Sequence, residues 1–232
     1  MKLRNPFRDL TVFERCLWGI SMLVVSASFL LAPDQNVLSL LASLVGVTAL
    51  IFVAKGYVFG QILIIVFAVL YGIVSFYLRY YGEMITYLGM SAPAAIFATV
   101  SWLRHPYKRG AEVKVNRLTT PLRWGMIGFT VVATVSFYWI LRALGTANLL
   151  FSTLSIATSM LASYLTFFRS PFYALAYAAN DVVLIVLWIL ATVQTPAYLP
   201  MIFCFVMFLA NDLYGFFNWQ RMKKRQSSCN VG

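Results

Sequence analysis

The stretch "AYLPMIFCFVMFLANDLYGFFNW", residues 197–219, is a long apolar run that ends in amides, an acid and aromatic rings. It is long enough for one helix to cross the hydrocarbon core of a bilayer, which takes about 20 apolar residues. Within it, Asn211 and Asp212 stand where side chains that face hydrocarbon are expected. Polar groups at such a depth are costly, so they usually face the interior of a helix bundle and mark a pathway. The stretch therefore predicts a membrane helix with one polar face.

The whole chain has the composition of a protein that crosses the membrane several times. Its 232 residues are 61% hydrophobic and 11% charged, whereas a soluble domain is about 45–50% apolar and about 25% charged. The predicted spans are residues 16–32, 36–54, 57–79, 84–103, 124–144, 148–168, 172–193 and 197–219. All are expected to be helices, because an unpaired backbone is too costly in lipid. The predicted fold class is all-α integral membrane.

The net charge of +11 would suggest a nucleic-acid partner in a soluble protein. Here the charges lie between and beyond the apolar runs, so we expect the lipid bilayer as partner and no nucleic acid. With the N-terminus inside, sixteen of the 18 cations fall on the inner side, and only Arg79 and Arg142 fall outside. Because inner loops carry an excess of Lys and Arg, both termini are predicted to be cytoplasmic.

The two halves of the chain resemble each other when Trp102 is aligned with Trp219, because each half ends in a tryptophan and a basic cluster. The predicted architecture is two parallel three-helix repeats joined by a linker helix (3+1+3), plus one extra N-terminal helix. Pro93 is expected to kink the third core helix. The predicted segments are a tail and extra helix (1–35), a first bundle (36–103), a basic loop and linker helix (104–147), a second bundle (148–219) and a basic, disordered tail (220–232).

Candidate binding residues are the polar and aromatic side chains at depth, among which an Asn-Asp pair recurs at 180–181 and 211–212. Helical spacing places Asn211, Tyr214 and Asn218 on one face. Amides both donate and accept hydrogen bonds, and aromatic rings attract a cationic ring, so the set suits a small, polar solute with a ring. Interface anchoring and hydrogen bonding between helices are the structural alternatives. The candidates are Asn180, Asp181, Trp188, Asn211, Asp212, Tyr214, Trp219, Gln61, Tyr71 and Trp102.

Three motifs, "YYGEM" at 80–84, "NDVVLIVLW" at 180–188 and "NDLYGFFNW" at 211–219, resemble those of the PnuC-type vitamin transporters, best known for nicotinamide riboside. The resemblance spans residues 36–225. It implies facilitated diffusion into the cell across the bacterial cytoplasmic membrane, made one-way by a cytoplasmic kinase that phosphorylates the imported nucleoside. It also implies homo-oligomers such as trimers.

Among the candidates, Asn180, Asn211, Tyr214 and Trp219 fit the family's motif positions. One departure concerns the substrate. Many nicotinamide riboside members carry W-x-x-W where this chain reads "TVSW", with Thr99 at the first position.

Other functions remain open from the sequence. Thiamine or another ring-bearing vitamin or nucleoside would suit the same groups. An intramembrane enzyme would need a nucleophile with a base or metal ligands at depth. The chain has neither H-E-x-x-H nor G-x-S-x-G, and its single histidine, His105, lies in a basic loop. We therefore expect no enzyme activity, no catalytic residue, no metal and no cofactor. A scaffold subunit without a solute pathway is the third alternative.

Overall fold

The apolar runs of the sequence are helices in the computed structural model, which describes residues 6–32, 37–77, 81–108, 110–146 and 148–228, with the backbone alone for 81–83. Eight helical stretches in the described residues are long and apolar enough to cross a membrane. No strand occurs in these ranges, although two isolated bridges do. The prediction of an all-α membrane fold with eight spans is confirmed. The elements are η1 (Pro6–Asp9), α1 (Val12–Leu30), α2 (Val37–Ala54), α3 (Val58–Tyr77), α4 (Tyr81–Thr86), η2 (Tyr87–Ser91), α5 (Ala92–Arg104), α6 (Thr120–Ala143), α7 (Leu149–Phe167), α8 (Tyr173–Gln194), η3 (Pro196–Tyr198) and α9 (Leu199–Ser228).

Two helix ends differ from the sequence prediction. Helix α1 begins before residue 16 because Thr11 caps it: its side chain accepts a hydrogen bond from the Glu14 amide, and the Glu14 carboxylate accepts one from the Thr11 amide. This reciprocal arrangement stabilises a helix start. Helix α9 continues to Ser228, so the expectation that residues 220 onward are disordered is wrong for 220–228. There the Gln226 side chain accepts a hydrogen bond from the Val115 backbone amide and donates one to the Glu112 carboxylate. These two bonds hold the last turns of α9 against the loop before α6.

The third core helix changes to π-helical geometry just before Pro93, the residue at which a kink was expected. A π-helical turn, η2, lies between α4 and α5, and Pro93 stands in the first turn of α5. Such turns insert an extra residue into a helix and are frequent at functional sites. Here the turn rotates Tyr87 and Ser91 toward the interior of the bundle, where both line a cavity.

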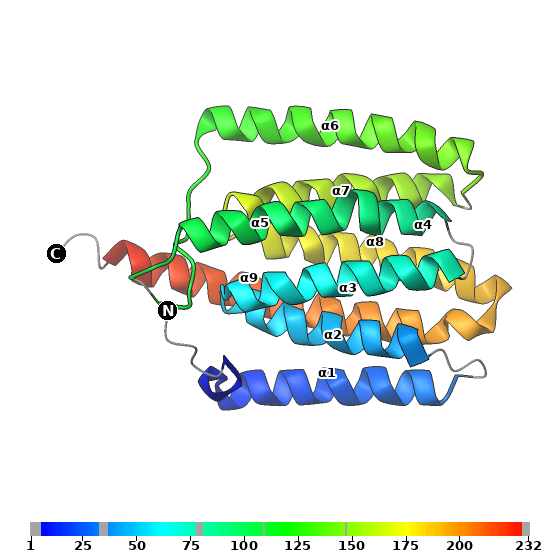
Figure 1. Ribbon diagram of the computed structural model, residues 1–232, viewed down its shortest axis with the longest axis horizontal. Coiled ribbons are helices and arrows are strands. Elements are labelled where there is room, and N and C mark those ends of the chain that lie inside the picture. The colour runs from blue at the N-terminus through cyan, green and yellow to red at the C-terminus, as the bar shows by residue number, and fades with distance from the viewer. Residues whose placement is uncertain (1–5, 33–36, 78–80, 109, 147, 229–232) are drawn as a thin grey trace.

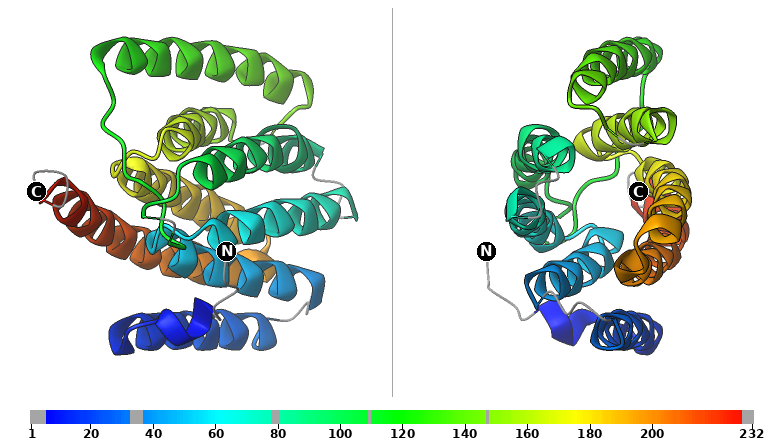
Figure 2. Two further views of the ribbon diagram at one scale, coloured as in Figure 1. Left: turned by 60° about the vertical axis from the view of Figure 1, so that its left-hand side comes forward. Right: turned by 90° about the vertical axis from the view of Figure 1, so that its right-hand side faces the viewer.

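Six helices form a closed ring in the order α2, α3, α5, α7, α8, α9, and α9 packs back against α2. Figure 2 shows this ring from its end. Along the chain, the helices of α2–α3–α5 and those of α7–α8–α9 contact one another in the same order. The ring encloses the space in which polar side chains can meet away from lipid.

Two helices lie outside the ring (Figure 1). Helix α1 packs on the seam between α2 and α9, and α6 packs on α7. Only 6% of the α6 span is buried inside the protein, and its outer side chains are large and apolar, for example Trp124, Phe129 and Trp139. That surface suits contact with lipid tails.

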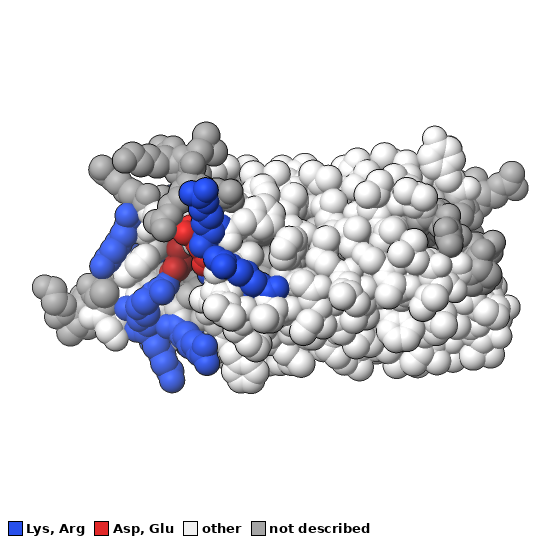
Figure 3. All heavy atoms as spheres, turned by 90° about the horizontal axis from the view of Figure 1, so that it is seen from below, with Lys and Arg blue, Asp and Glu red and all other residues white. Residues whose placement is uncertain are grey.

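The end of the bundle at which α1 begins and α9 ends, here called the basic end, carries the cations that Figure 3 shows clustered on one face. Helices α2 and α7 both finish at this end with the same backbone geometry. Gly56 and Arg169 have φ of 70° and 55°, and the next amides, of Tyr57 and Ser170, bond back to Phe52 and Leu165. This is the Schellman-type helix end.

The segment that joins α5 to α6 crosses the basic end and contacts both helix ends. Its Val113 amide donates to the Gly56 carbonyl at 2.9 Å, and its Asn116 amide donates to the Arg169 carbonyl at 3.0 Å. Val113 is buried, with 1% of its surface exposed. The connection is therefore an ordered crossing, held by main-chain bonds to the two halves of the ring.

Candidate functional site

The ring of helices encloses a cavity of about 530 Å³, lined mainly by residues of α2, α3, η2, α5, α7, α8 and α9, with Thr86 of α4, Leu141 of α6 and Tyr198 of η3. It runs from Val53 and Thr166, near the basic end, to Thr146 and Tyr198 at the opposite end. The volume lies within the range of pockets that hold small molecules, roughly 300–1,000 Å³. The cavity is therefore large enough for a vitamin or nucleoside.

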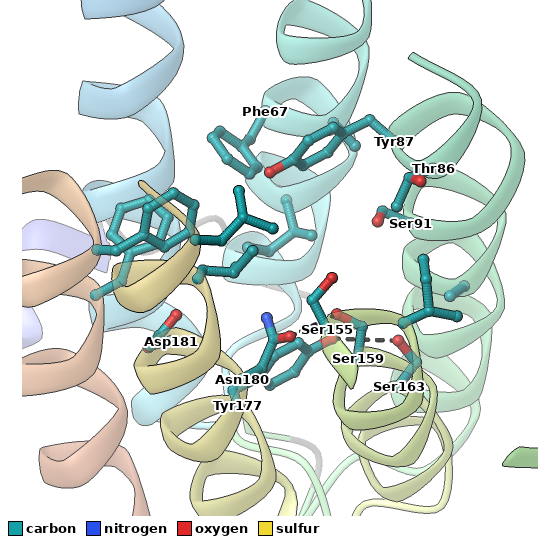
Figure 4. Close-up of a pocket in the computed structure, with 18 of the residues that line it drawn as sticks. Phe67, Thr86, Tyr87, Ser91, Ser155, Ser159, Ser163, Tyr177, Asn180 and Asp181 are labelled. Carbon is teal, nitrogen blue, oxygen red and sulfur yellow. Dashed lines mark hydrogen bonds between the residues drawn. The ribbon is translucent and has the colours of Figure 1, made fainter. Parts of the chain in front are cut away.

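One wall of the cavity carries hydroxyl groups from α7. Ser155, Ser159 and Ser163 lie four residues apart and so share one helix face. Figure 4 shows Ser159 next to Asn180 and Ser163 next to Tyr177 of the neighbouring α8, whereas the Ser155 hydroxyl donates to the Ser152 carbonyl of its own helix. The hydroxyls of Ser163 and Tyr177 are 3.4 Å apart. Hydroxyls both donate and accept hydrogen bonds, so this wall can match the hydroxyl groups of a ligand.

Two acids meet beside that wall. Asp181 of α8 and Asp212 of α9 both line the cavity and are 3% and 4% exposed. One carboxylate oxygen of Asp181 has no hydrogen-bond partner among the described residues. No lysine, arginine or histidine occurs among the described residues that line the cavity. Burial and mutual repulsion disfavour a charge on both acids at once, so it is the lack of any cation in the described lining that disfavours an anionic ligand.

The opposite wall is aromatic. Phe67 of α3 and Tyr87 of η2 line the cavity with their rings 5.9 Å apart, edge to face, and Figure 4 shows them across from the α7 serines. Tyr71 supports Tyr87 from behind, with the ring centroids 4.5 Å apart. Trp188 lines the cavity nearer the opposite end and contacts the Tyr198 ring at 5.5 Å. Flat rings of this kind can hold a planar or cationic ring.

Toward the basic end, the route beyond the cavity is closed by tryptophans. Trp102 of α5 and Trp219 of α9 are fully buried, with ring centroids 5.3 Å apart. The Trp102 indole donates to the Thr166 carbonyl at 2.9 Å, and the Trp219 indole donates to the Val53 carbonyl at 3.0 Å. Tyr173 packs on Trp219 and separates it from the cavity. The structure is thus sealed at this end.

The structure divides the candidates from the sequence into two groups. Five line the cavity: Gln61, Asn180, Asp181, Trp188 and Asp212. Five do not: Tyr71, Trp102, Asn211, Tyr214 and Trp219. Within the second group, Tyr71 packs behind the aromatic wall, and the two tryptophans seal the basic end.

Asn211 and Tyr214 point to α1 instead. The Asn211 amide donates to Ser21 of α1 at 3.0 Å, and the Tyr214 hydroxyl donates to Glu14 of α1 at 2.7 Å. The Glu14 carboxylate also pairs with Lys55 at 2.8 Å. Of the polar face of α9 that spacing grouped together, Asn211 and Tyr214 therefore bind the extra helix, and Asn218 donates to the Ala54 carbonyl of α2. The adjoining stripe presents Asp212 to the cavity.

Several lining residues were not among the candidates from the sequence: Thr86, Tyr87, Ser91, Ser155, Ser159, Ser163 and Tyr177. The four-residue spacing of Ser155, Ser159 and Ser163 was the available signal, since it marks one face of a helix. No group of three or more His, Cys, Asp or Glu side chains that could hold a metal occurs in the described part of the chain.

The chain is similar to known transporters in sequence and in fold. Residues 36–221 match the model of a family described as nicotinamide mononucleotide transporter. A curated relative from Neisseria mucosa, named nicotinamide riboside transporter PnuC, is 26% identical over 97% of this chain and 87% of its own. A protein of the same name from Haemophilus influenzae is 26% identical over 85% of each chain. A crystal structure of the vitamin B3 transporter PnuC matches with a TM-score of 0.79 at 26% identity, over 94% of each chain. These relatives are named as transporters and not as enzymes.

Proposed function

The chain belongs to the family described as nicotinamide mononucleotide transporter, that of the PnuC-type transporters, and we propose that it takes up nicotinamide riboside by facilitated diffusion. The observation that carries the proposal is the cavity, which combines two acids, a hydroxyl wall and an aromatic wall. Nicotinamide riboside has a cationic pyridinium ring and a neutral sugar. Each part of this ligand has a matching wall.

The charge of the cavity favours the riboside over its phosphorylated form. Phosphate groups are bound by arginine, lysine or helix N-termini, and no Lys or Arg lines the described cavity. A charge on either Asp181 or Asp212 would repel a phosphate, whereas it would attract a pyridinium cation. Phosphorylation by a kinase inside the cell would therefore trap the imported nucleoside, because the product no longer fits the cavity electrostatically.

Alternating access is the mechanism we favour. The two triplets, α2–α3–α5 and α7–α8–α9, joined by α6, would form parallel repeats that rock about the cavity. Opening the basic end requires Trp102 and Trp219 to leave the Thr166 and Val53 carbonyls, because those bonds link the two triplets. No nucleotide-binding loop of the G-x-x-x-x-G-K-[ST] type occurs in the sequence.

The membrane placement follows from the charges. The basic end would face the cytoplasm by the positive-inside rule, with both termini inside, in the bacterial cytoplasmic membrane. Because PnuC-type proteins are expected to form homo-oligomers such as trimers, we propose that copies of this chain contact one another through the outer faces of α1 and α6.

Counterflow in proteoliposomes tests the function. Vesicles preloaded with unlabelled nicotinamide riboside should accumulate the labelled riboside, and the mononucleotide should not compete. Thiamine is the second candidate, because its cationic ring suits the same acid pair. Transport of labelled thiamine without transport of the riboside would overturn the proposal in favour of that vitamin.

A further inference from the structure

The side-chain amide of Asn180 is held in one orientation by α7. Its oxygen accepts hydrogen bonds from the Thr158 hydroxyl at 2.8 Å and from the Ser159 hydroxyl at 3.1 Å. The Thr158 hydroxyl also lies near two carbonyls of its own helix, at 3.0 and 3.1 Å, but the Asn180 oxygen is its nearest acceptor. With its oxygen engaged, the amide must present its NH2 group elsewhere.

That NH2 group is aimed into the cavity. Figure 4 shows the Asn180 nitrogen turned away from the α7 hydroxyls that hold the oxygen. Asn180 is only 6% exposed, and no described residue accepts a hydrogen bond from this nitrogen. The cavity therefore offers a fixed donor that a ligand oxygen can satisfy.

Resting on the proposed function, we propose that Thr158 and Ser159 are positioning residues that fix Asn180 as a hydrogen-bond donor to the sugar of the nucleoside. The neighbouring groups point to the sugar rather than to the ring. Ser155, Ser163 and Tyr177 add hydroxyls to the same wall, whereas Phe67 and Tyr87 lie across the cavity from it. The sugar then lies against α7 and α8, and the cationic ring lies against Phe67 and Tyr87.

Thr158 gives the sharper test, because it does not line the cavity and acts only through Asn180. Thr158→Val keeps the shape of the side chain and removes the donor. Binding to the purified protein is measured by competition for nicotinamide riboside and for 1-methylnicotinamide, which keeps the charged ring and lacks the sugar. The variant should bind the riboside about five- to tenfold more weakly, as for one lost hydrogen bond, and should bind 1-methylnicotinamide as the wild type does.

Two controls accompany this measurement. Thr158→Ser restores a hydroxyl and should restore riboside binding. Thr153→Val makes the same change on the same helix, at a hydroxyl that bonds to its own helix at Leu149 and does not line the cavity, and it should change neither affinity. Should Thr158→Val fail to fold, Ser159→Ala removes the second donor and carries the same expectation.

The outcomes separate the two proposals. Equal weakening of both ligands, or unchanged riboside affinity, would overturn the positioning role while leaving riboside transport intact. A wild-type protein that binds 1-methylnicotinamide as tightly as the riboside would also overturn it, because the sugar would then contribute nothing. A wild-type protein that binds neither compound would overturn the proposed function as well.

Discussion

Trp102 and Trp219 make reciprocal hydrogen bonds across the bundle. Each indole lies on the third core helix of one triplet and donates to a carbonyl near the end of the first helix of the other, at 2.9 and 3.0 Å. The two rings also touch, with centroids 5.3 Å apart. The pair therefore joins the two triplets twice at the basic end.

Replacing either tryptophan by phenylalanine removes one of these bonds. Trp102→Phe and Trp219→Phe should each lower the free energy of unfolding by about 1 kcal/mol, the usual net value of a hydrogen bond. Because the rings are in contact, the double variant should deviate from additivity by about 0.5 kcal/mol or more. Thermal unfolding in detergent is measured for the wild type, the two single variants and the double variant, which together form a double-mutant cycle. Strictly additive losses would show that the two bonds are independent.

Asn180 and Asn211 are equivalent in the sequence motif but differ in the structure. Asn180→Ala should weaken riboside binding about tenfold, because Asn180 lines the cavity. Asn211→Ala should leave the affinity unchanged and lower the melting temperature, because Asn211 bonds to Ser21 of α1. Affinity and melting temperature are measured on both variants. A loss of affinity in Asn211→Ala alone would contradict the placement of the two amides.

Glu14 anchors α1 to the ring. Its carboxylate is 2% exposed and pairs with Lys55, so Glu14→Gln leaves a buried cation without its partner and should cost on the order of 3 kcal/mol. The matched control is Glu112→Gln, which breaks the exposed pair with Arg225 and should cost less than about 1 kcal/mol. Thermal shift assays compare the two. Riboside affinity should be unchanged in both, since neither glutamate lines the cavity.

Gly60 marks the closest approach of α2 and α3. A Cβ atom at this position would lie 2.4 Å from the backbone nitrogen of Val53, which cannot move aside. Gly60→Ala should therefore reduce the yield of folded protein in the membrane. Gly19→Ala is the control, because nothing lies within 4 Å of its added Cβ, and it should be neutral or stabilising by up to about 1 kcal/mol. Size-exclusion profiles in detergent report both, and equal profiles would refute the close contact.

The spans were predictable because each apolar run is long enough to cross the bilayer by itself. The depth of Asn180, Asp181 and Trp188 was predictable for the same reason, since spacing along one helix fixes which residues share a face. Which helix packs against each of these faces was not predictable from the sequence. Asn211 and Tyr214 bind α1 because that helix brings Ser21 and Glu14 to them, and helical spacing alone carries no information about which helix lies opposite.

The hydroxyl wall and the π-helical turn escaped the sequence for different reasons. Serine is a mild polar residue that can bond to its own helix, so Ser155, Ser159 and Ser163 do not mark a site as an acid does. Pro93 indicated a break in the third core helix, but the extra residue of η2, which turns Tyr87 inward, depends on packing with α3. The order of residues 220–228 depends likewise on contacts with the distant loop.

The crossing between α5 and α6 sets a limit on motion. Its amides at Val113 and Asn116 hold the ends of α2 and α7 through main-chain bonds, and three residues of fully extended chain reach only ~10 Å. This short segment limits how far the ends of α2 and α7 can separate: once the chain between the two amides is fully extended, further separation requires a main-chain bond to break. Side-chain substitutions leave this limit unchanged, whereas residues inserted between Val113 and Asn116 would allow a larger separation.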